Sequence, residues 1–450
     1  MHLIRQWRSR TAFLIGLGVV FVGVILLLYD VARAEKGNSL LYEEENTIDV
    51  GDESESFAND TLMLETLLAY ANAHNPAIRA ARNRGLAARE RPAQVSALDD
   101  PMFTYEGFNI PENFDLTRTD NNILKLSQKL PFPGKRRLRG QIAAHEAEIA
   151  GEELRMIEVT IRAEVKKAYY DLWQVHQNLL TYSRDKELMA QFATIAEKKY
   201  ATGQVPQLDV LRAQLDLTRL ITRVTTETLR MGEVKAMLNR LLSRPPEAAL
   251  GIPRAVPKVE VRQTLTELTE LALNNRPEIA VQTAAISRDT TALALAQKAY
   301  FPDFEVYAER FFNTGRRDGV GVVFSATIPL AYREKYDAGV SEAKARVSAS
   351  KANLRAAQDT ALAEVKSALV RAQTAVERVN LFALTHIPQA EQALALSRMS
   401  YQTGKVDFLS LIDSLRVVEQ VHLEHIAAAT DFEKAYADLE QAVGRELSRN

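Results

Sequence analysis

The second half of the sequence repeats landmarks of the first half in the same order, and this constrains the fold more than any other feature. The coincidences appear when the sequence is shifted against itself by roughly 200 residues, so each copy is large enough to hold several helices and strands. The matching pairs are Leu64 and Leu265, Pro76 and Pro277, Pro101 and Pro302, Tyr200 and Tyr401, and Gly203 and Gly404. We therefore predict a tandem structural repeat, with one unit at 61–243, a second at 261–446 and a proline-rich linker at 244–260.

The N-terminus has the order of features that marks an exported protein. Arginines within the first ten residues precede an uncharged apolar run, and the small residues Ala32 and Ala34 follow it at the spacing of a cleavage site. These features predict a signal peptide at 1–34, and without cleavage the same segment would anchor the chain in the inner membrane. Residues 35–60 hold nine acids and one lysine, which predicts a flexible acidic arm.

Each unit is dominated by one very long helix. The predicted ranges are 135–201 and 335–402, and within them only Pro388 lacks the backbone N–H that a helix needs. Apolar residues of the first range recur at spacings of three and four, which is the period of a coiled coil. At 1.5 Å per residue such a helix is about 100 Å long, so it must lie in an elongated bundle beside similar helices.

Shorter helices flank the long ones, so the fold class is mainly α. In each unit a helix with a proline near its start comes first, and a return helix comes last, after a glycine that ends the long helix. The first helices are predicted at 61–98 and 264–300, and the return helices at 207–243 and 408–446.

A small β part is predicted between the first helix and the long helix of each unit. Strands at 102–110, 123–130 and 320–328 alternate apolar and polar residues, with polar loops between strands. Nine to eleven residues is about the length that a tilted strand needs to cross a bilayer. In 123–130 the leucines would meet lipid, whereas Lys125 and Lys129 would face a lumen.

Four such strands per chain cannot close a membrane barrel, because single-chain barrels begin at about eight strands and open edges are not tolerated in lipid. Two chains would supply eight strands, whose interior is filled by side chains, and three would supply twelve, which leaves a lumen. A homotrimer with a 12-stranded barrel is therefore expected for a duct.

Composition excludes several classes of function. The chain has no cysteine, so thiol chemistry, disulfides and a cysteine-linked lipid anchor are absent, and the formal net charge of −2 does not favour nucleic acid. His422 and His425 are three residues apart without a third ligand nearby in sequence, which is more typical of a polar helix surface than of a metal site. We predict no catalytic, cofactor-binding or metal-binding residue and no enzyme activity.

Two segments carry a resemblance to a known family. The run from Tyr200 to Gln214, YATGQVPQLDVLRAQ, is matched in the second unit by YQTGKVDFLSLID from Tyr401 to Asp413, and LPFPGK precedes the first long helix. This arrangement resembles the TolC-type outer-membrane efflux proteins over about 61–446.

The resemblance implies a trimer with a long periplasmic α-helical barrel below the outer-membrane β-barrel. Such a protein is the exit duct of a tripartite efflux or secretion system, and it works with a periplasmic adaptor and an inner-membrane pump. The cargo, whether metal ion, drug or protein, stays open. The alternative is a periplasmic coiled-coil scaffold or adaptor, which would need the long helices but not the strands.

The resemblance also assigns roles at the turns between the long and return helices. Gly203 and Gly404 mark the periplasmic tips, where Leu208 and Leu409 would help to dock the adaptor. A plain helix-turn-helix connection is the alternative interpretation of both turns.

The pore constriction is expected beside these tips. The resemblance implies that Asp413 forms an acidic ring in the trimer, that Ser410 stands where some members carry a second acid, and that Tyr401 bonds Asp209 across helices. Val406 replaces an arginine that takes part in the gate of close relatives. For each acid the alternative is a solvated helix face, the usual location of charged side chains.

Overall fold

The structure is a computed structural model that describes residues 57, 61–108, 121–254, 260–313 and 317–448. The chain divides into one unit at 1–60 and a second from residue 61 onward, and only the second is described below. The predicted signal peptide at 1–34, nearly all of the acidic arm at 35–60 and the loop at 111–120 lie outside the described residues.

The second unit contains two successive sets of elements in the same order: two short helices, two strands, a long helix and a return helix. The first set is α3 (Leu64–His74), α4 (Pro76–Ser96), β2 (Met102–Phe108), β3 (Asn121–Leu130), α5 (Lys135–Ala201) and α6 (Gln207–Leu241). The second set is α7 (Leu265–Asn275), α8 (Pro277–Lys298), β5 (Phe304–Asn313), β6 (Gly319–Ala326), η3 (Tyr332–Asp337), α9 (Ala338–Leu381), η4 (Phe382–His386), α10 (Ile387–Gln402) and α11 (Phe408–Val443).

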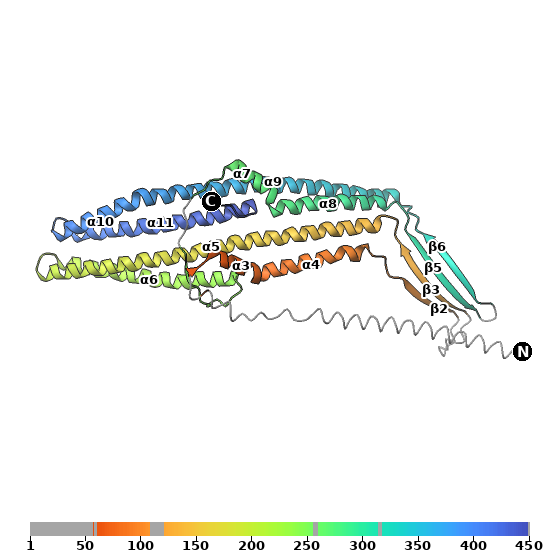
Figure 1. Cartoon of the computed structure of the whole chain (residues 1–450), viewed down its shortest axis with the longest axis horizontal. Coiled ribbons are helices and arrows are strands. Elements are labelled where there is room, and N and C mark those ends of the chain that lie inside the picture. The colour runs from red at the N-terminus through yellow and green to blue at the C-terminus, as the bar shows by residue number, and fades with distance from the viewer. Residues whose placement is uncertain (1–56, 58–60, 109–120, 255–259, 314–316, 449–450) are drawn as a thin grey trace, which may run out of the picture. The chain divides into compact units, whose positions relative to one another are not determined.

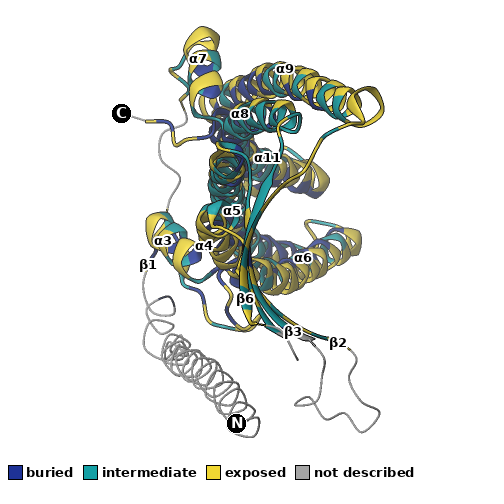
Figure 2. Ribbon diagram, turned by 90° about the vertical axis from the view of Figure 1, so that its right-hand side faces the viewer, coloured by how far each residue is buried: buried dark blue, intermediate teal, exposed yellow. Residues whose placement is uncertain are grey.

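The helices of this unit run side by side, with the sheet at one end and the α5–α6 and α10–α11 turns at the other (Figure 1). The helix α5 lies in the middle and packs against α4, α6, α8 and α11 (Figure 2). Among the described helices, none combines the length and the apolar character needed to cross a membrane.

The breaks predicted near the start of both first helices are confirmed, at Asn75 and Arg276. The Asn75 side chain accepts hydrogen bonds from the backbone N–H groups of Ala77 and Ile78, which caps α4. One bound was wrong: Thr61 is not helical but pairs in parallel with Ile252 in a two-stranded sheet. This short pairing ties part of the predicted linker to the start of the unit.

The two long helices differ in their internal geometry. The helix α5 has the predicted bounds, whereas the second long helix begins at Tyr332 and contains two π-helical segments, η3 and η4. The second of these lies just before Pro388, and the Ile387 N–H donates a hydrogen bond to the Phe382 carbonyl, five residues back. A proline cannot donate in the helical ladder, so this wider turn lets the helix continue through it.

The strands β2, β3, β5 and β6 form one antiparallel sheet in the order β2-β3-β5-β6. Because directly paired residues of antiparallel strands share a face, the register sorts the side chains. One face is mainly apolar and includes Phe103, Tyr105, Leu124, Leu126, Ala308, Val320, Val322 and Phe324. The opposite face includes Thr104, Glu106, Lys125, Lys129, Glu305, Tyr307 and Glu309.

The predicted alternation in 123–130 is therefore confirmed in its geometry, since the leucines and Lys125 lie on opposite faces. The Lys125 ammonium lies 3.7 Å from the centre of the Tyr307 ring on the polar face. Ile328, however, lies beyond β6, which ends at Ala326.

Candidate functional site at the hairpin tips

The two turns at the far end of the helices have the same backbone geometry. Gly203 and Gly404 have φ angles of 72° and 73°, a left-handed conformation that side chains with a Cβ adopt only at a cost. The next residue then bonds back to the helix: the Gln204 N–H donates to the Lys199 carbonyl at 2.9 Å, and the Lys405 N–H to the Ser400 carbonyl at 2.8 Å. These bonds end α5 and α10 as helices commonly end at glycine.

An apolar cluster joins the two hairpins just behind the turns. It is formed by side chains of α5, α6, α10 and α11: Met189, Phe192, Ala193, Ala196, Ala213, Leu220, Tyr401, Phe408, Leu411, Ile412 and Leu415. Tyr401 is only 2% exposed, and its ring lies 5.3 Å from that of Phe408, measured between centroids. The cluster holds the start of α11 against the end of α5 in one chain.

Tyr401 and Asp209 are brought close together, but they do not form the predicted bond. Burial, and secondarily the charge of Asp209, raises the pKa of Tyr401 to about 12. Among the described residues, the buried Tyr401 hydroxyl nevertheless has no hydrogen-bond partner. No hydrogen bond therefore joins Tyr401 to Asp209 within the described part of the chain.

Asp209 itself is 8% exposed at the start of α6. Burial raises its pKa, the nearby Arg212 guanidinium lowers it, and the Asp407 carboxylate raises it again. A carboxylate at this place is held in a setting that disfavours its charge.

Asp413 lies on the exposed side of α11, with 57% of its side chain accessible. Its Oδ1 is 3.2 Å from Nη1 of Arg416, and Nη2 of the same arginine is 2.8 Å from Oδ1 of Asp216 on α6. Arg416 therefore bridges the two return helices and offsets part of the charge of Asp413. Whether Asp413 faces a pore depends on neighbouring copies and stays a prediction.

Ser410 takes part in capping α11. The Asp407 side chain accepts hydrogen bonds from the Ser410 N–H at 3.0 Å and from the Ser410 hydroxyl at 2.5 Å. These bonds lower the pKa of Asp407, because they stabilise its charged form. Ser410 is exposed and lies one turn before Asp413, on the same side of the helix.

Leu208 and Leu409 occupy the first turns of α6 and α11, and both are exposed, by 52% and 38%. On α6 the exposed apolar surface continues through Leu211 and Leu215, which are 53% and 71% exposed. Residues spaced by three and four lie on one helix face, so Leu208, Leu211 and Leu215 form a continuous apolar stripe from the tip.

Sequence reasoning missed two basic residues that join the hairpins. The Lys199 ammonium donates to the Tyr401 carbonyl at 2.6 Å, and Arg223 Nη1 lies 2.5 Å from Glu419 Oε1. Both contacts link residues about two hundred positions apart, which no local pattern marks. The Arg416 contact with Asp413 was accessible in principle, because the two residues are three apart on one helix.

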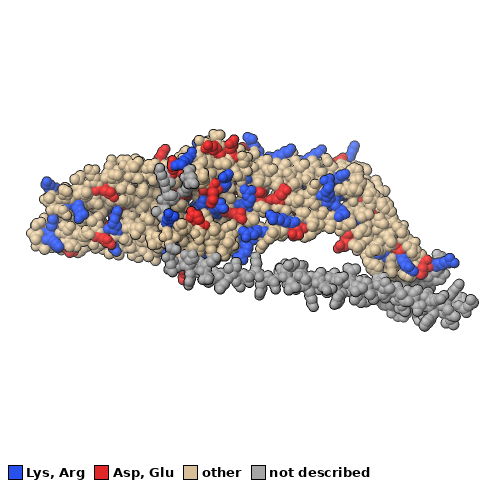
Figure 3. All heavy atoms as spheres, in the orientation of Figure 1, with Lys and Arg blue, Asp and Glu red and all other residues tan. Residues whose placement is uncertain are grey.

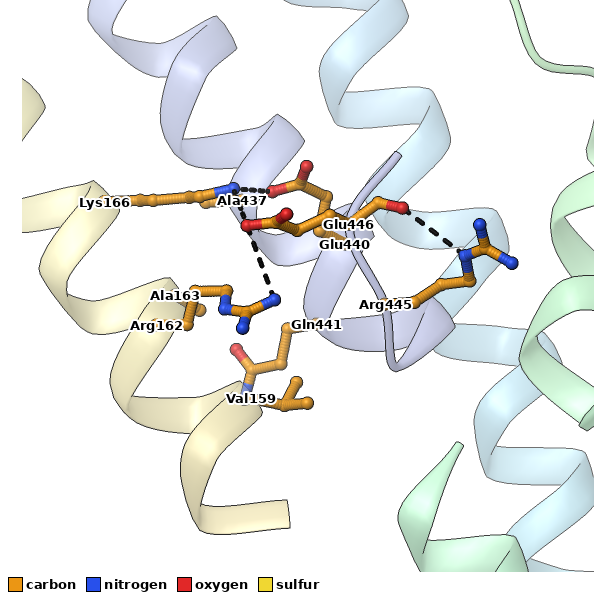
Figure 4. Close-up of a pocket in the computed structure, with 9 residues that line it drawn as sticks. All are labelled: Val159, Arg162, Ala163, Lys166, Ala437, Glu440, Gln441, Arg445 and Glu446. Atoms are coloured by element: carbon orange, nitrogen blue, oxygen red, sulfur yellow. Dashed lines mark hydrogen bonds and ion pairs between the residues drawn. The ribbon is translucent and has the colours of Figure 1, made fainter. Parts of the chain in front are cut away.

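A pocket between α5 and the other end of α11 offers little space for a ligand. Figure 4 shows Lys166 and Arg162 of α5 directed at Glu440 and Glu446, with Lys166 Nζ 2.5 Å from Glu440 Oε2. The pocket has a volume of about 10 Å³, which leaves room for roughly one water molecule. On the face drawn in Figure 3, acids and bases are interspersed around this middle region. Within the described residues, no group of three or more potential ligands could hold a metal ion.

Known proteins share both the sequence pattern and the fold. The sequence profile of the family described as outer membrane efflux protein matches residues 67–220 and 268–445. The cobalt-zinc-cadmium resistance protein CzcC of Cupriavidus metallidurans is 21% identical over 333 residues, which cover 73% of this chain and 78% of that protein.

Two solved structures illustrate the likeness of fold. The outer membrane protein VceC of Vibrio cholerae superposes with a TM-score of 0.72 at 18% identity, covering 85% of this chain and 96% of VceC. The transmembrane channel CusC superposes with a TM-score of 0.74 at 17% identity, covering 87% of this chain and 94% of CusC.

Proposed function

This chain belongs to the outer membrane efflux protein family, and we propose that three copies of it assemble into the exit duct of a tripartite efflux or secretion system. Membership of the family makes the protein an outer-membrane channel that spans into the periplasm and passes substrates outward. The observation that carries the proposal for this chain is its four-stranded sheet, with one mainly apolar face, joined end-on to helices of up to 67 residues.

The trimer follows from the strand count. Among the residues that the structure describes, the outer strands β2 and β6 are each paired on only one side, and an unpaired strand edge is not tolerated in lipid. Three copies would pair every edge and give a 12-stranded barrel, with the apolar face toward lipid and the face of Lys125 toward the lumen. The recurring order of elements supports a tandem repeat, so six similar hairpins would line one periplasmic tube.

Exposed apolar residues on the helices support assembly with further copies. On α6 they include Leu215 and Leu229, which are 71% and 70% exposed. On the second long helix they include Leu384 and Met399, which are 77% and 64% exposed. Contiguous hairpins around a tube would meet along α6 of one copy and the second long helix of the next. Packing of these two helices against each other would cover the exposed apolar residues of both.

The tips are proposed to meet the rest of the export system. In the proposed duct the turns at Gly203 and Gly404 point into the periplasm, and the exposed Leu208 beside the first turn offers an apolar contact for a helical adaptor tip. The inner-membrane pump would deliver cargo to this end. The resistance function in the name of CzcC makes metal ions one candidate cargo.

The duct and its oligomeric state are tested together. We expect the detergent-purified protein to have the mass of a trimer and to conduct ions in planar lipid bilayers. A monomer or dimer without conductance would instead favour a periplasmic coiled-coil scaffold.

The orientation of the sheet is tested with single introduced cysteines, which are unique because the chain has none. In the assembled trimer Lys125→Cys should react with a water-soluble thiol reagent, and its neighbour Leu126→Cys should not. Equal labelling of the two positions would contradict the proposed lipid and lumen faces.

Asp413 is proposed to form an acidic ring at the periplasmic constriction. Three carboxylates around a narrow pore would attract cations and repel anions, although Arg416 offsets part of this charge. Asp413→Ala should therefore weaken cation preference and block by multivalent cations, while leaving the trimer intact. Asp359→Ala is the matched control, because Asp359 is also exposed and paired with an arginine, Arg355, on α9. Unchanged selectivity and block in Asp413→Ala would make Asp413 a solvated surface acid.

A further inference from the structure

In addition to the apolar cluster behind the turns, Lys199 makes polar contacts that join the end of α5 to the end of α10. Lys199 Nζ donates to the Tyr401 carbonyl at 2.6 Å and approaches the Gln402 carbonyl at 3.4 Å. The same ammonium lies 4.4 Å from the centre of the Tyr401 ring. The last carbonyls of a helix have no partner within it and carry the negative end of the helix dipole, so a cation suits this place.

Other contacts join the hairpins farther from the tip. Arg416 pairs with Asp216, and Arg223 pairs with Glu419. At 1.5 Å per residue, Asp216 and Arg223 lie roughly 14 and 24 Å along α6 from its start. Lys199, in the last turn of α5, therefore makes the outermost polar tie between the two hairpins among the described contacts.

The corresponding position in the second hairpin does not make this tie. Ser400 stands where the first hairpin has Lys199, and a serine side chain is too short and uncharged to replace it. The adjacent Lys198 is exposed and carries the same charge in the same helical turn. The contact therefore depends on Lys199 and on where its side chain lies, and not simply on the presence of a positive charge in the last turn of α5.

We propose that Lys199 is a latch that holds the periplasmic tip of the duct closed within each chain. The proposal rests on the proposed function, and it assigns the closed state to an ammonium bound to backbone carbonyls instead of a Tyr401 hydroxyl bound to Asp209. In the proposed duct, separation of the two hairpins would widen the tip, and Lys199 would then have to release the carbonyls of α10. Because Lys199 binds the backbone carbonyl oxygen of Tyr401, the latch should survive removal of the tyrosine hydroxyl.

Removal of one hydrogen bond to a charged group should shift the balance of open and closed tips by about tenfold to a hundredfold. In planar bilayers Lys199→Met should therefore raise the open probability or the conductance of the purified trimer. Lys199→Arg keeps the charge and the donors and should stay near the wild type. Lys198→Met is the matched control, since it removes the neighbouring charge and leaves the latch in place.

The outcomes separate the latch from its alternatives. Wild-type behaviour of an assembled Lys199→Met trimer would overturn the proposal, as would equal opening in Lys198→Met. If Tyr401→Phe raises the open probability or the conductance and Lys199→Met does not, the closed state depends on the Tyr401 hydroxyl. That result would also overturn the latch. If Lys199→Met fails to assemble, Lys199→Gln takes its place, because the shorter neutral amide cannot reach the carbonyls, and unchanged conductance then overturns the latch. Absence of conductance in both the wild type and an assembled Lys199→Met trimer would contradict the duct itself.

Discussion

Tyr200 at the first hairpin turn is 47% exposed, whereas Tyr401 at the corresponding place in the second turn is 2% exposed. The backbones of the two turns match closely, since Gly203 and Gly404 differ by only 1° in φ. The surroundings differ because Tyr401 is part of the apolar cluster between the hairpins, while Tyr200 is not among its residues. Equal local sequence thus gives equal turns, and packing against other helices decides which tyrosine becomes core.

The polar residues of the two turns differ in the same way. Asp209 is buried near Tyr401, whereas the corresponding Ser410 is exposed and bonds to the capping Asp407. Lys199 reaches across to the second hairpin, and Ser400 makes no such contact. The first turn therefore supplies charged groups to the contact between hairpins, and the second supplies the apolar ring and the backbone carbonyls.

The largest difference between the turns is expected on truncation of the tyrosines. Tyr401→Ala should cost about 3–5 kcal/mol of folding free energy, because it removes a fully buried aromatic ring. Tyr200→Ala should change stability by less than about 0.5 kcal/mol, as expected for an exposed position. Thermal unfolding of the detergent-solubilised protein, followed by circular dichroism, measures both. A large loss in Tyr200→Ala would mean that a neighbouring copy buries this ring in the assembly.

The turn glycines should respond equally, which tests whether the two backbones are equivalent. Gly203→Ala and Gly404→Ala should each cost about 1–2 kcal/mol, since alanine disfavours the left-handed conformation. An added Cβ would meet no atom within 4 Å at either site, so no steric clash adds to this cost. Gly232→Ala within α6 is the control and should gain about 1 kcal/mol from better helix propensity. Clearly unequal melting temperatures of the two turn variants would break the equivalence.

The smallest effect is expected from the carboxyl groups, through the pH dependence of stability. Burial raises the pKa of Asp209 in the folded chain, so its protonated form is favoured there and its contribution to stability grows as the pH falls through that pKa. Asp209→Asn should therefore be more stable than the wild type at neutral pH, and the difference should vanish below about pH 4.

Asp407 should show the opposite pH dependence of stability in the same measurement. Hydrogen bonds from Ser410 lower its pKa, so its contribution is present at neutral pH and is lost as the pH falls. Asp407→Asn should be less stable than the wild type at neutral pH, with a gap that closes in acid. Melting temperatures from about pH 2.5 to about pH 7.5 compare the two variants, because the pKa of Asp407 lies below its ordinary value of about 4. Parallel curves for both variants would contradict the assigned pKa directions.

The sequence predicted most of the fold because its strongest signals are local. The bounds of α5 at Lys135 and Ala201 follow from a glycine before it, a glycine after it and no proline between them. The helix breaks at Asn75 and Arg276 were predicted because a proline comes directly after each of these residues. The π-helical turn before Pro388 was not predicted, because a proline can end, kink or widen a helix according to what packs around it.

By itself the sequence determined the lengths of the helices, the turn glycines and the alternation of the strands. Each of these depends on backbone geometry and periodicity within a few turns of one element. The tertiary structure alone decided that Tyr401 is core, that its hydroxyl does not bond to Asp209, and that Lys199 binds the end of α10. Such contacts join residues 202 positions apart, as between Lys199 and Tyr401, and their burial and partners depend on how two hairpins pack side by side.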